Sequence, residues 1–236
     1  MKIAIIGTVG VPASYGGFET LVENLIEDAS ERYTVYCSGP HYAERVTAYK
    51  NANLIYIPLN ANGVQSIIYD IWSIIHALLT GHKNLLVLGT SGAIVLPLVK
   101  LFCPTVNVVT NIDGLEWKRQ KWKGFAKVFL KFSERLAVNF SSTVVADNEA
   151  IAKHVETNYR RTCETIAYGG DHAYIEKILL QTPQTAFGGE RYAFALCRIE
   201  PENNVHLILD AFLDSKINLV FVGNWKASDY GRQLIE

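Results

Sequence analysis

The sequence predicts an α/β protein built on a doubly wound parallel sheet, followed by an incomplete second unit of the same kind. Three observations predict this. Apolar, β-branched runs of strand length alternate with helical patterns along the chain, two of those runs lead directly into glycine-containing loops, and the two starts lie far apart, at 2–7 and 217–223. Strands that are apolar throughout are typical of a parallel sheet with helices on both faces.

The first predicted strand, Ile3–Ile6, leads into a loop that ends at Gly16 and Gly17. The helix after this loop has the clearest pattern of the chain, because its apolar residues recur at i, i+3, i+4, i+7, i+8 and i+11. These residues are Phe18, Leu21, Val22, Leu25, Ile26 and Ala29. The pattern predicts one apolar stripe that lies on the sheet.

Strands and helices continue to alternate after this helix. Further strands are predicted at Thr34–Cys37, Leu54–Ile57, Leu85–Leu88, Val106–Val109 and Thr143–Ala146. Helices are predicted at about Ser66–Leu79, Ala93–Phe102, Lys123–Phe140 and Glu149–Glu156. Each run has the length and composition that its class requires.

A second unit is expected beyond the polar segment Gln181–Glu190, which has the composition of a linker. It has a strand at Tyr192–Cys197, a helix at Val205–Phe212, a strand at Ile217–Val222 and the beginning of another helix. That makes roughly 50 residues, against about 100 or more in an ordinary domain. We therefore expect a first domain over 1–180 and the truncated start of a second over 190–236.

Composition excludes several classes of protein. Hydrophobic residues make up 49% and charged residues 19% of the chain, and the net charge is −1. The four cysteines are widely spaced without a CxxC pair, so neither a disulfide framework nor a zinc site is expected, and a cytoplasmic location is favoured. The first apolar run is too short for a signal peptide, and no run reaches 18 apolar residues.

The loop that ends at Gly16 and Gly17 is the first candidate binding site. Two glycines allow a ligand to approach the backbone closely, and amide groups at a helix start favour an anion. The spacing differs from the dinucleotide fingerprint GxGxxG. A merely flexible connection between strand and helix is the alternative.

The second candidate follows the strand predicted to end at Val109. Asp113 and Glu116 are candidate catalytic acids or bases, Trp117 is a candidate for stacking on a sugar, and two cations follow. These cations are Lys118 and Arg119. The alternative is a capped, solvated helix start. No DxD occurs in the chain, so we expect no metal ion.

The third candidate is a basic stretch from Lys118 to Lys131, which has six basic residues and no acidic one. Lys123, Lys127 and Lys131 recur every four residues, a pattern that suits an anionic membrane surface or a solvated helix face. A second stripe on this helix is apolar, and we expect it in the core. Its members are Trp122, Phe125, Phe129, Phe132 and Leu136.

The fourth candidate is Arg198, which directly follows the predicted strand Tyr192–Cys197. An Arg at the end of a strand and before a helix is well placed to bind a diphosphate. A surface Arg in a salt bridge is the alternative.

Taken in order, these segments resemble the nucleotide-sugar glycosyltransferases with two facing Rossmann-like domains, the GT-B type. The resemblance covers essentially the whole chain. It rests on the Gly-Gly-Phe-Glu loop at 16–19, the turn Ile166–Asp171, the segment Leu196–Asn204, and Val220–Asn224. The Tyr-Gly-Gly-Phe-Glu and Asp-Gly-Leu-Glu-Trp-Lys-Arg versions resemble the bacterial rhamnosyltransferases of capsular and cell-wall polysaccharide assembly.

The resemblance implies a retaining, metal-independent transfer of a sugar from a nucleoside-diphosphate sugar to a lipid-linked acceptor, at the inner face of the cell membrane. It assigns donor diphosphate binding to Arg198, while Asn203 stands where the family has a second cation, a Lys. The family's Glu-x7-Glu segment is expected beyond Glu236, so the fragment alone is expected to be inactive. No cofactor and no nucleic-acid partner are expected.

Two other functions stay open on the sequence. A nucleotide-sugar epimerase can share this architecture and would act without an acceptor. A non-catalytic module that binds nucleotide or phospholipid would show binding without turnover.

Overall fold

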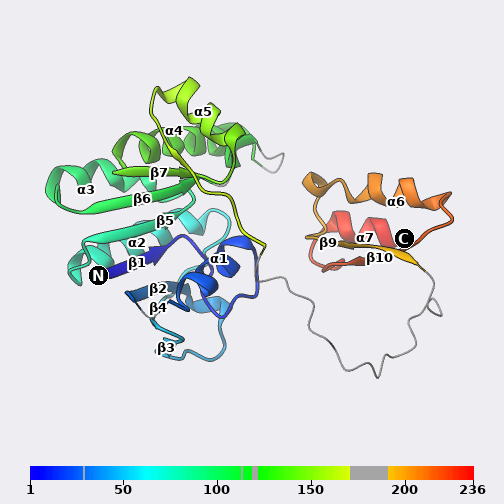
Figure 1. Ribbon diagram of the computed structural model, residues 1–236, viewed down its shortest axis with the longest axis horizontal. Coiled ribbons are helices and arrows are strands. Elements are labelled where there is room, and N and C mark those ends of the chain that lie inside the picture. Colours follow the sequence, from blue (N-terminus) through cyan, green and yellow to red (C-terminus); the bar gives the residue numbers. More distant parts are fainter. Residues whose placement is uncertain (29, 113, 119–121, 171–190) are drawn as a thin grey trace. The chain divides into compact units, whose positions relative to one another are not determined.

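The computed structural model describes residues 1–28, 30–112, 114–118, 122–170 and 191–236. The chain divides into two compact units, Met1–Gly170 and Asp171–Glu236 (Figure 1).

The regular elements follow one another in strict alternation through most of the chain. The strands are β1 (Lys2–Ile6), β2 (Arg32–Ser38), β3 (Ala48–Tyr49), β4 (Ala52–Ile57), β5 (Asn84–Leu88), β6 (Asn107–Ile112), β7 (Thr143–Ala146), β8 (Glu164–Thr165), β9 (Tyr192–Leu196) and β10 (Asn218–Val222). The α-helices are α1 (Gly17–Leu25), α2 (Gln65–Leu79), α3 (Leu96–Phe102), α4 (Gly124–Phe140), α5 (Glu149–Tyr159), α6 (Val205–Leu213) and α7 (Asp229–Ile235). Short 3-10 helices are η1 (Gly39–His41), η2 (Ala93–Val95), η3 (Glu116–Lys118) and η4 (Pro201–Asn203).

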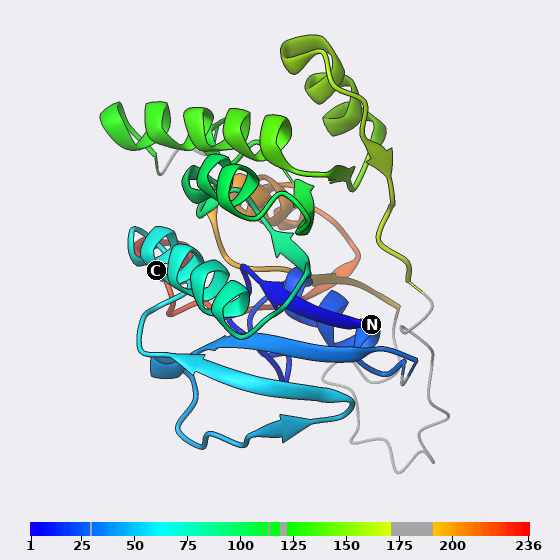
Figure 2. The ribbon, with the colours of Figure 1, turned by 90° about the vertical axis from the view of Figure 1, so that its left-hand side faces the viewer.

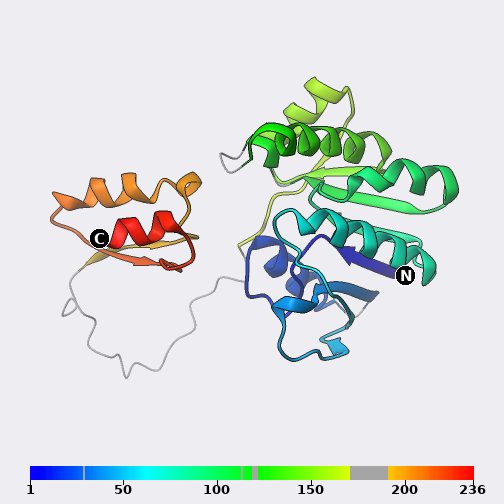
Figure 3. The ribbon, with the colours of Figure 1, turned by 180° about the vertical axis from the view of Figure 1, so that it is seen from behind.

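The first unit is one eight-stranded sheet in the order β3-β4-β2-β1-β5-β6-β7-β8, which can be followed from both sides in Figures 1 and 3. Every pair of neighbouring strands is parallel except β3 and β4, which run antiparallel at the edge. This architecture confirms the predicted fold class. The order reverses between β1 and β5, because the chain first winds towards β4 and then returns to wind towards β8.

Helices cover both faces of this sheet, as neighbouring residues of β1 demonstrate. Ile5 lies in a core cluster with Val22 of α1 and with Ile26, which directly follows this helix, whereas Ile6 lies in a core cluster with residues of α2, α3 and α4. Successive side chains of a strand point to opposite faces, so α1 covers one face and these three helices cover the other. Figure 2 shows α2, α3 and α4 side by side on their face.

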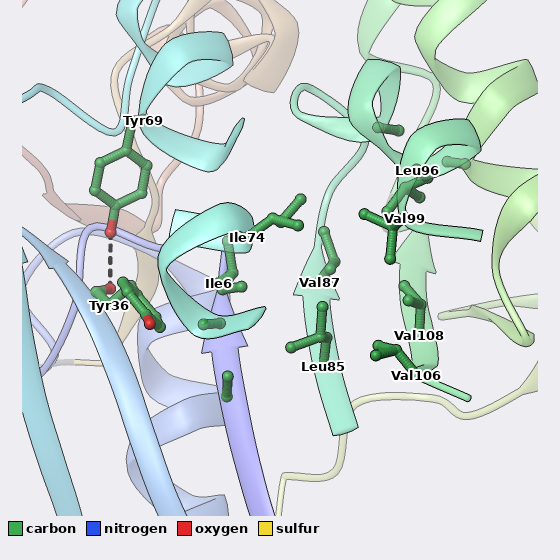
Figure 4. Packing of buried hydrophobic residues seen from close by; sticks show 14 of the residues in the cluster. Ile6, Tyr36, Tyr69, Ile74, Leu85, Val87, Leu96, Val99, Val106 and Val108 are labelled. Carbon is green, nitrogen blue, oxygen red and sulfur yellow. Dashed lines mark hydrogen bonds between the residues drawn. The ribbon is translucent and has the colours of Figure 1, made fainter. Parts of the chain in front are cut away.

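The larger core cluster lies beneath α2 and α3 (Figure 4). It includes one polar connection: the hydroxyl of Tyr69 donates to the backbone oxygens of Tyr36 at 2.7 Å and of Thr8 at 3.0 Å. A buried tyrosine needs such a partner. The bond fixes α2 to the carboxyl ends of β1 and β2.

The described part of the second unit contains a parallel pair of strands, β9 and β10, with α6 between them in sequence and α7 after them. Gly223 follows β10 and packs tightly, since a Cβ there would lie 2.5 Å from Cδ1 of Ile199. The predicted strands and helix are present within one or two residues.

The structure differs from the sequence prediction at several element ends. The first helix ends at Leu25, and the predicted helix Ala93–Phe102 divides into η2 and α3, with Pro97 in the first turn of α3, where proline is tolerated. The short strands β3 and β8 were not predicted. Ala29 and the predicted linker 181–190 lie outside the described residues.

Candidate functional site

The carboxyl ends of β1 and β5 form the point where the sheet reverses its winding. In open α/β sheets, ligands bind outside the carboxyl ends of the strands at such a point. Two glycine-containing loops begin there, one over 7–16 after β1 and one over 89–92 after β5. The candidate site is built on these two loops.

At two positions of the first loop the structure requires glycine. Gly7 has a φ of +95°, and a Cβ there would lie 2.0 Å from the backbone oxygen of Leu88. Gly10 has a φ of +124° and would collide with Cys37. Side chains at these positions are excluded by the neighbouring strands, so these glycines seat the loop on β5 and β2.

Gly16 and Gly17, the predicted binding residues, are different. Gly16 is extended, with a φ of −162°, and a Cβ on Gly17 would meet no atom within 4 Å. Neither backbone conformation nor internal packing therefore requires glycine at 17. A position that is glycine and faces open space at a helix start permits another molecule to approach the backbone.

Two carboxylates of α1 hold the loop in place. Glu19, which is buried, accepts a hydrogen bond of 2.7 Å from the amide of Val9, and Glu23 accepts one of 2.7 Å from the amide of Ala13. The hydroxyl of Tyr49 also donates to Glu23 at 2.6 Å. Burial acts to raise the pKa of Glu23, but these hydrogen bonds and Lys50 together lower it below its usual value.

The second loop, Gly89-Thr90-Ser91-Gly92, was not singled out from the sequence. The hydroxyl of Ser91 donates to the buried carboxyl group of Asp70 on α2, and a Cβ on Gly92 would lie 2.3 Å from the Cβ of Asp70. From α4, the hydroxyl of Ser133 donates to the backbone oxygen of Thr90 at 2.5 Å. Side chains of two helices, α2 and α4, thus hold this loop in place. The sequence feature that could have revealed the loop is a pair of glycines directly after an apolar run, as in the first loop.

Asp70 titrates far from its ordinary range. Burial raises its pKa from 3.8 to about 7, although hydrogen bonds from Ser91 and from the Gly92 amide act in the opposite direction. The folded chain therefore keeps the Asp70 proton between about pH 4 and pH 7, where the unfolded chain has lost it.

The free energy of unfolding is consequently expected to fall as the pH rises through this window, by roughly 1.4 kcal/mol per pH unit from Asp70 alone. The contribution is complete below about pH 4 and is lost as the pH passes about 7. Asp70→Asn removes this titration. In urea denaturation, the free energy of unfolding of the variant, relative to that of wild type, should therefore be higher at about pH 8 than at about pH 5.

Asp28→Asn is the matched control in the same unit. The amide and hydroxyl of Ser30 lower the pKa of Asp28, so its titration lies below the window, and the variant should follow wild type. If the free energies of unfolding of Asp70→Asn and wild type differ by the same amount at both pH values, the raised pKa of Asp70 is contradicted.

The region after β6 contains the predicted catalytic residues. Asp113 directly follows β6 in sequence, and both Asp113 and Arg119 lie outside the described residues. Glu116 begins η3 and accepts a hydrogen bond of 2.9 Å from the indole of Trp122. The roles of Asp113 and Glu116 stay predictions.

Trp117 is anchored from several sides. Its indole nitrogen donates to Glu134 at 2.9 Å, and the Nζ atoms of Lys118 and Lys131 lie 5.4 and 5.1 Å from the centre of its ring. Cations at this distance are attracted to the aromatic ring. The structure thus brings three predicted site residues together, while sugar stacking on Trp117 stays a prediction.

A buried polar residue at the end of β6 was missed. Asn111 is almost completely buried, its amide nitrogen lies 3.5 Å from the hydroxyl of Tyr168, and its side-chain oxygen has no hydrogen-bond partner among the described residues. The available signal was an asparagine next to the last residue of the strand, shortly before the predicted site residue Asp113.

The lysines of the basic stretch are exposed, and their contact with a membrane stays a prediction, whereas the apolar stripe differs from the expectation. Lys123 precedes α4, and Lys127 and Lys131 lie on it, all exposed. The expectation that the apolar stripe is in the core was wrong, because Phe125 is 83% and Phe132 is 50% exposed. The buried face consists instead of Leu130, Ser133, Glu134, Ala137 and Val138.

Polar partners explain this inversion. Glu134 is buried because it accepts hydrogen bonds from the indole of Trp117, from Nε2 of His154 at 2.9 Å and from the hydroxyl of Tyr159 at 2.5 Å. Ser133 is buried because it bonds the loop after β5. Satisfied polar groups can occupy the inner face, and the phenylalanines then point outward.

In the second unit, Arg198 lies just beyond β9 and is exposed. The side-chain amide of Asn203 donates to its backbone oxygen at 2.7 Å, which fixes the turn. Within the described residues, the guanidinium group makes no hydrogen bond or ion pair. Its charge is thus available to a ligand.

The described residues contain no cluster of three or more His, Cys, Asp or Glu side chains that could hold a metal ion. Among the helices described, none has both the length and the apolar character needed to span a bilayer.

Solved structures of low sequence identity share this fold. An Arabidopsis thaliana UGT89C1 structure complexed with UDP-L-rhamnose has a TM-score of 0.51 and 10% identity, covering 94% of this chain and 64% of that one. The N-terminal domain of Candida albicans trehalose-6-phosphate phosphatase has a TM-score of 0.58 and 8% identity, with coverages of 94% and 63%. An S. aureus MnaA–UDP structure has a TM-score of 0.52 and 14% identity, with coverages of 99% and 64%.

The chain thus spans less than two thirds of the length of these three solved chains. No curated protein matches it in sequence. At the level of families the match is direct: residues 1–171, which include the complete eight-stranded sheet, match the family described as "Domain of unknown function (DUF1972)", and the chain belongs to this family.

Proposed function

We propose that this chain is the nucleotide-sugar-binding and acceptor-binding part of a glycosyltransferase that moves a sugar, rhamnose in our proposal, onto a lipid-linked saccharide. The observation that carries the proposal is the open position at Gly17, beside Gly16, at the point where the sheet reverses. Fold similarity to proteins crystallised with UDP-L-rhamnose and with UDP supports the same class of ligand.

The two units have different tasks in this proposal. The first unit, with Gly16 and Gly17, binds the acceptor and the sugar end of the donor. The second unit binds the diphosphate of the donor through Arg198, whose guanidinium group makes no hydrogen bond or ion pair within the described residues. Charge-assisted hydrogen bonds from Arg are well suited to phosphate.

The proposed reaction retains the configuration of the sugar and uses no metal ion. The bond between the sugar and the diphosphate breaks, a bond to the acceptor oxygen forms, and the acceptor proton moves to a base. Asp113 is the proposed base and Glu116 the second candidate. Trp117, Lys118 and Arg119 contribute to substrate binding.

We further propose that the protein works in the cytoplasm, at the inner face of the cell membrane. Lys123, Lys127 and Lys131 are exposed on or next to one helix, and each such residue near an anionic bilayer contributes about 1 kcal/mol. This contact brings the enzyme to a lipid-linked acceptor.

Donor binding by the purified protein tests the proposal. In calorimetry against a panel of nucleoside-diphosphate sugars, Arg198→Ala is expected to weaken binding by about 1.5–3 kcal/mol, the usual loss for a hydrogen bond to a charged group. Arg191→Ala is the matched control, because Arg191 is also exposed in the second unit. Equal losses in both variants would contradict the assignment of Arg198.

Gly17→Ala tests whether the open position at Gly17 is part of the binding site. The variant should keep its thermal stability, since the added Cβ meets no atom, and should lose donor or acceptor binding. Normal binding and turnover by this variant would count against the site. If the nucleotide sugar is turned over without an acceptor, the protein is an epimerase and not a transferase. If it is bound without any turnover, the protein is a binding module.

A further inference from the structure

The outer surface of the three helices on one side of the sheet is unusually apolar. Opposite the buried face of α2 lie Val64, which caps the start of the helix, and Ile68, Trp72, Ile75 and Leu79 on it, and all are exposed. Trp72 is 49% and Leu79 82% exposed. The spacing of these residues follows one face of the helix, so α2 has an apolar inner face and an apolar outer face.

The two neighbouring helices continue this surface. On η2 and α3 the exposed apolar residues are Ile94, Leu98, Leu101 and Phe102, and on α4 they are Phe125, Val128 and Phe132. Phe102 is 75% exposed. The helices lie side by side in Figure 2, and α3 contacts α4 directly. We call these twelve residues of the three helices the apolar face.

Soluble proteins rarely expose contiguous apolar patches of more than a few hundred Å², and larger ones mark interfaces with proteins or membranes. The apolar face also has a shallow, largely open depression between Ile68, Ile71, Trp72 and Ile75 of α2. Its lining is entirely apolar, which suits hydrocarbon and not a nucleotide or a sugar.

The exposed charges of the segment that forms the apolar face have one sign, and the nearest exposed acids in sequence after it are Glu149 and Glu156 of α5, which contacts α4. Between residues 64 and 140, no exposed Asp or Glu occurs among the described residues, since Asp70 and Glu134 are buried and Glu116 is half-buried and bonded. The exposed charged residues there are Lys83, Lys100, Lys118, Lys123, Lys127, Lys131 and Arg135. Among the charged side chains that this segment exposes, the structure therefore describes cations and no carboxylate.

We infer that the apolar face inserts its side chains into the surface of an anionic lipid bilayer, with α2, α3 and α4 lying along the membrane. An apolar surface bordered by Lys and Arg is the pattern of proteins that lie in the bilayer interface. The inference rests on the proposed membrane contact and changes its nature: apolar insertion by three helices, and not attraction by the lysines of one helix, holds the protein there.

A second copy of the chain is the competing occupant, and the charges disfavour it. In a two-fold dimer the same patch meets itself. The basic residues of α4 would then share one interface with those of the second copy, without an exposed acid among the described residues of this face to neutralise them. Anionic lipid supplies the missing negative charge.

Sedimentation with vesicles tests the inference on the full chain. Vesicles of phosphatidylcholine with and without phosphatidylglycerol are compared at low and high salt. The double variant Trp72→Gln/Leu79→Gln removes two exposed contacts of α2 and should reduce binding to anionic vesicles at least tenfold. Leu25→Gln is the matched control: Leu25 is exposed on α1, which covers the opposite face of the sheet, and binding should not change.

Quenching distinguishes insertion from simple attraction. Lipids brominated on their acyl chains should quench part of the tryptophan fluorescence, and Trp72→Phe should remove that part while the vesicles still bind.

Two outcomes would overturn the inference. If Trp72→Gln/Leu79→Gln binds like wild type while Lys127→Glu/Lys131→Glu does not bind, the contact is electrostatic, and the proposed membrane contact stands without insertion. If the chain does not bind vesicles, and if it forms a dimer that Trp72→Gln/Leu79→Gln does not form, a second copy covers the apolar face. Neither outcome concerns donor binding, which calorimetry tests separately.

Discussion

Glu134→Ala is expected to destabilise the first unit by about 3–5 kcal/mol, the range found when one partner of a buried polar or ionic pair is removed. The carboxylate connects η3, α4 and α5, because it accepts hydrogen bonds from Trp117, His154 and Tyr159. Its loss leaves three donors without an acceptor, and each unsatisfied buried group costs about 1–3 kcal/mol. Urea denaturation followed by circular dichroism measures the loss.

Two further variants make this expectation specific. Glu156→Ala replaces an exposed glutamate of α5 and should cost well under 1 kcal/mol, as is usual for surface changes. Tyr159→Phe removes one donor and should have an intermediate effect, since burial and the bond to Glu134 both raise the pKa of this hydroxyl and keep it protonated. A loss from Glu134→Ala no larger than that from Glu156→Ala would show that the three hydrogen bonds contribute little.

Asp113→Asn is expected to lower kcat of the proposed glycosyltransferase about 100-fold or more, with the fold and donor binding unchanged. Asp113 is the next residue in sequence after β6, whose carboxyl end lies at the same edge of the sheet as those of β1 and β5, and ligands of such folds bind at this edge. An amide of the same shape cannot accept the acceptor proton as a carboxylate does. Steady-state kinetics with a saccharide acceptor measures the effect.

Asp147→Asn is a matched control because Asp147 directly follows β7, the neighbouring strand. Its carboxylate accepts a hydrogen bond of 2.6 Å from Asn148, so it has a local role, and kcat should stay near normal. If Asp113→Asn keeps a normal kcat and Glu116→Gln loses it, the base is Glu116.

Much of the first sheet could be predicted because of its parallel topology. Central parallel strands are buried on both faces, so each appears as a continuous apolar run, as in β1, β5 and β7. The strands that were missed, β3 and β8, have two residues each and are half-buried or exposed. Such short edge strands form through pairing with a neighbour and have no pattern of their own.

The inner face of α4 could not be predicted, because apolarity does not determine burial there. Ser133 and Glu134 are buried through partners on the loop after β5 and on α5, which are distant in sequence. Phe125 and Phe132 are exposed for the same reason. Only the tertiary contacts reveal which stripe is the inner one.

Glycines illustrate a second limit of the sequence. Gly7 and Gly17 belong to one loop and the helix that follows it, yet Gly7 is required by its positive φ and its contact with Leu88, while Gly17 is not required by anything within the described structure. The sequence names Gly17 as a candidate binding residue, but the physical difference between the two positions appears only in the structure.

The carboxylates of α1 determine which chemical groups of a ligand the first loop can bind. Glu19 and Glu23 already occupy the amides of Val9 and Ala13, and Glu19 lies in the first turn of α1, where its negative charge compensates the positive end of the helix dipole. A phosphate would gain little there and would meet two like charges. The loop is therefore suited to uncharged hydroxyl groups, so inorganic phosphate should compete poorly at Gly17, and the counter-charge for a nucleotide has to come from cations outside this loop.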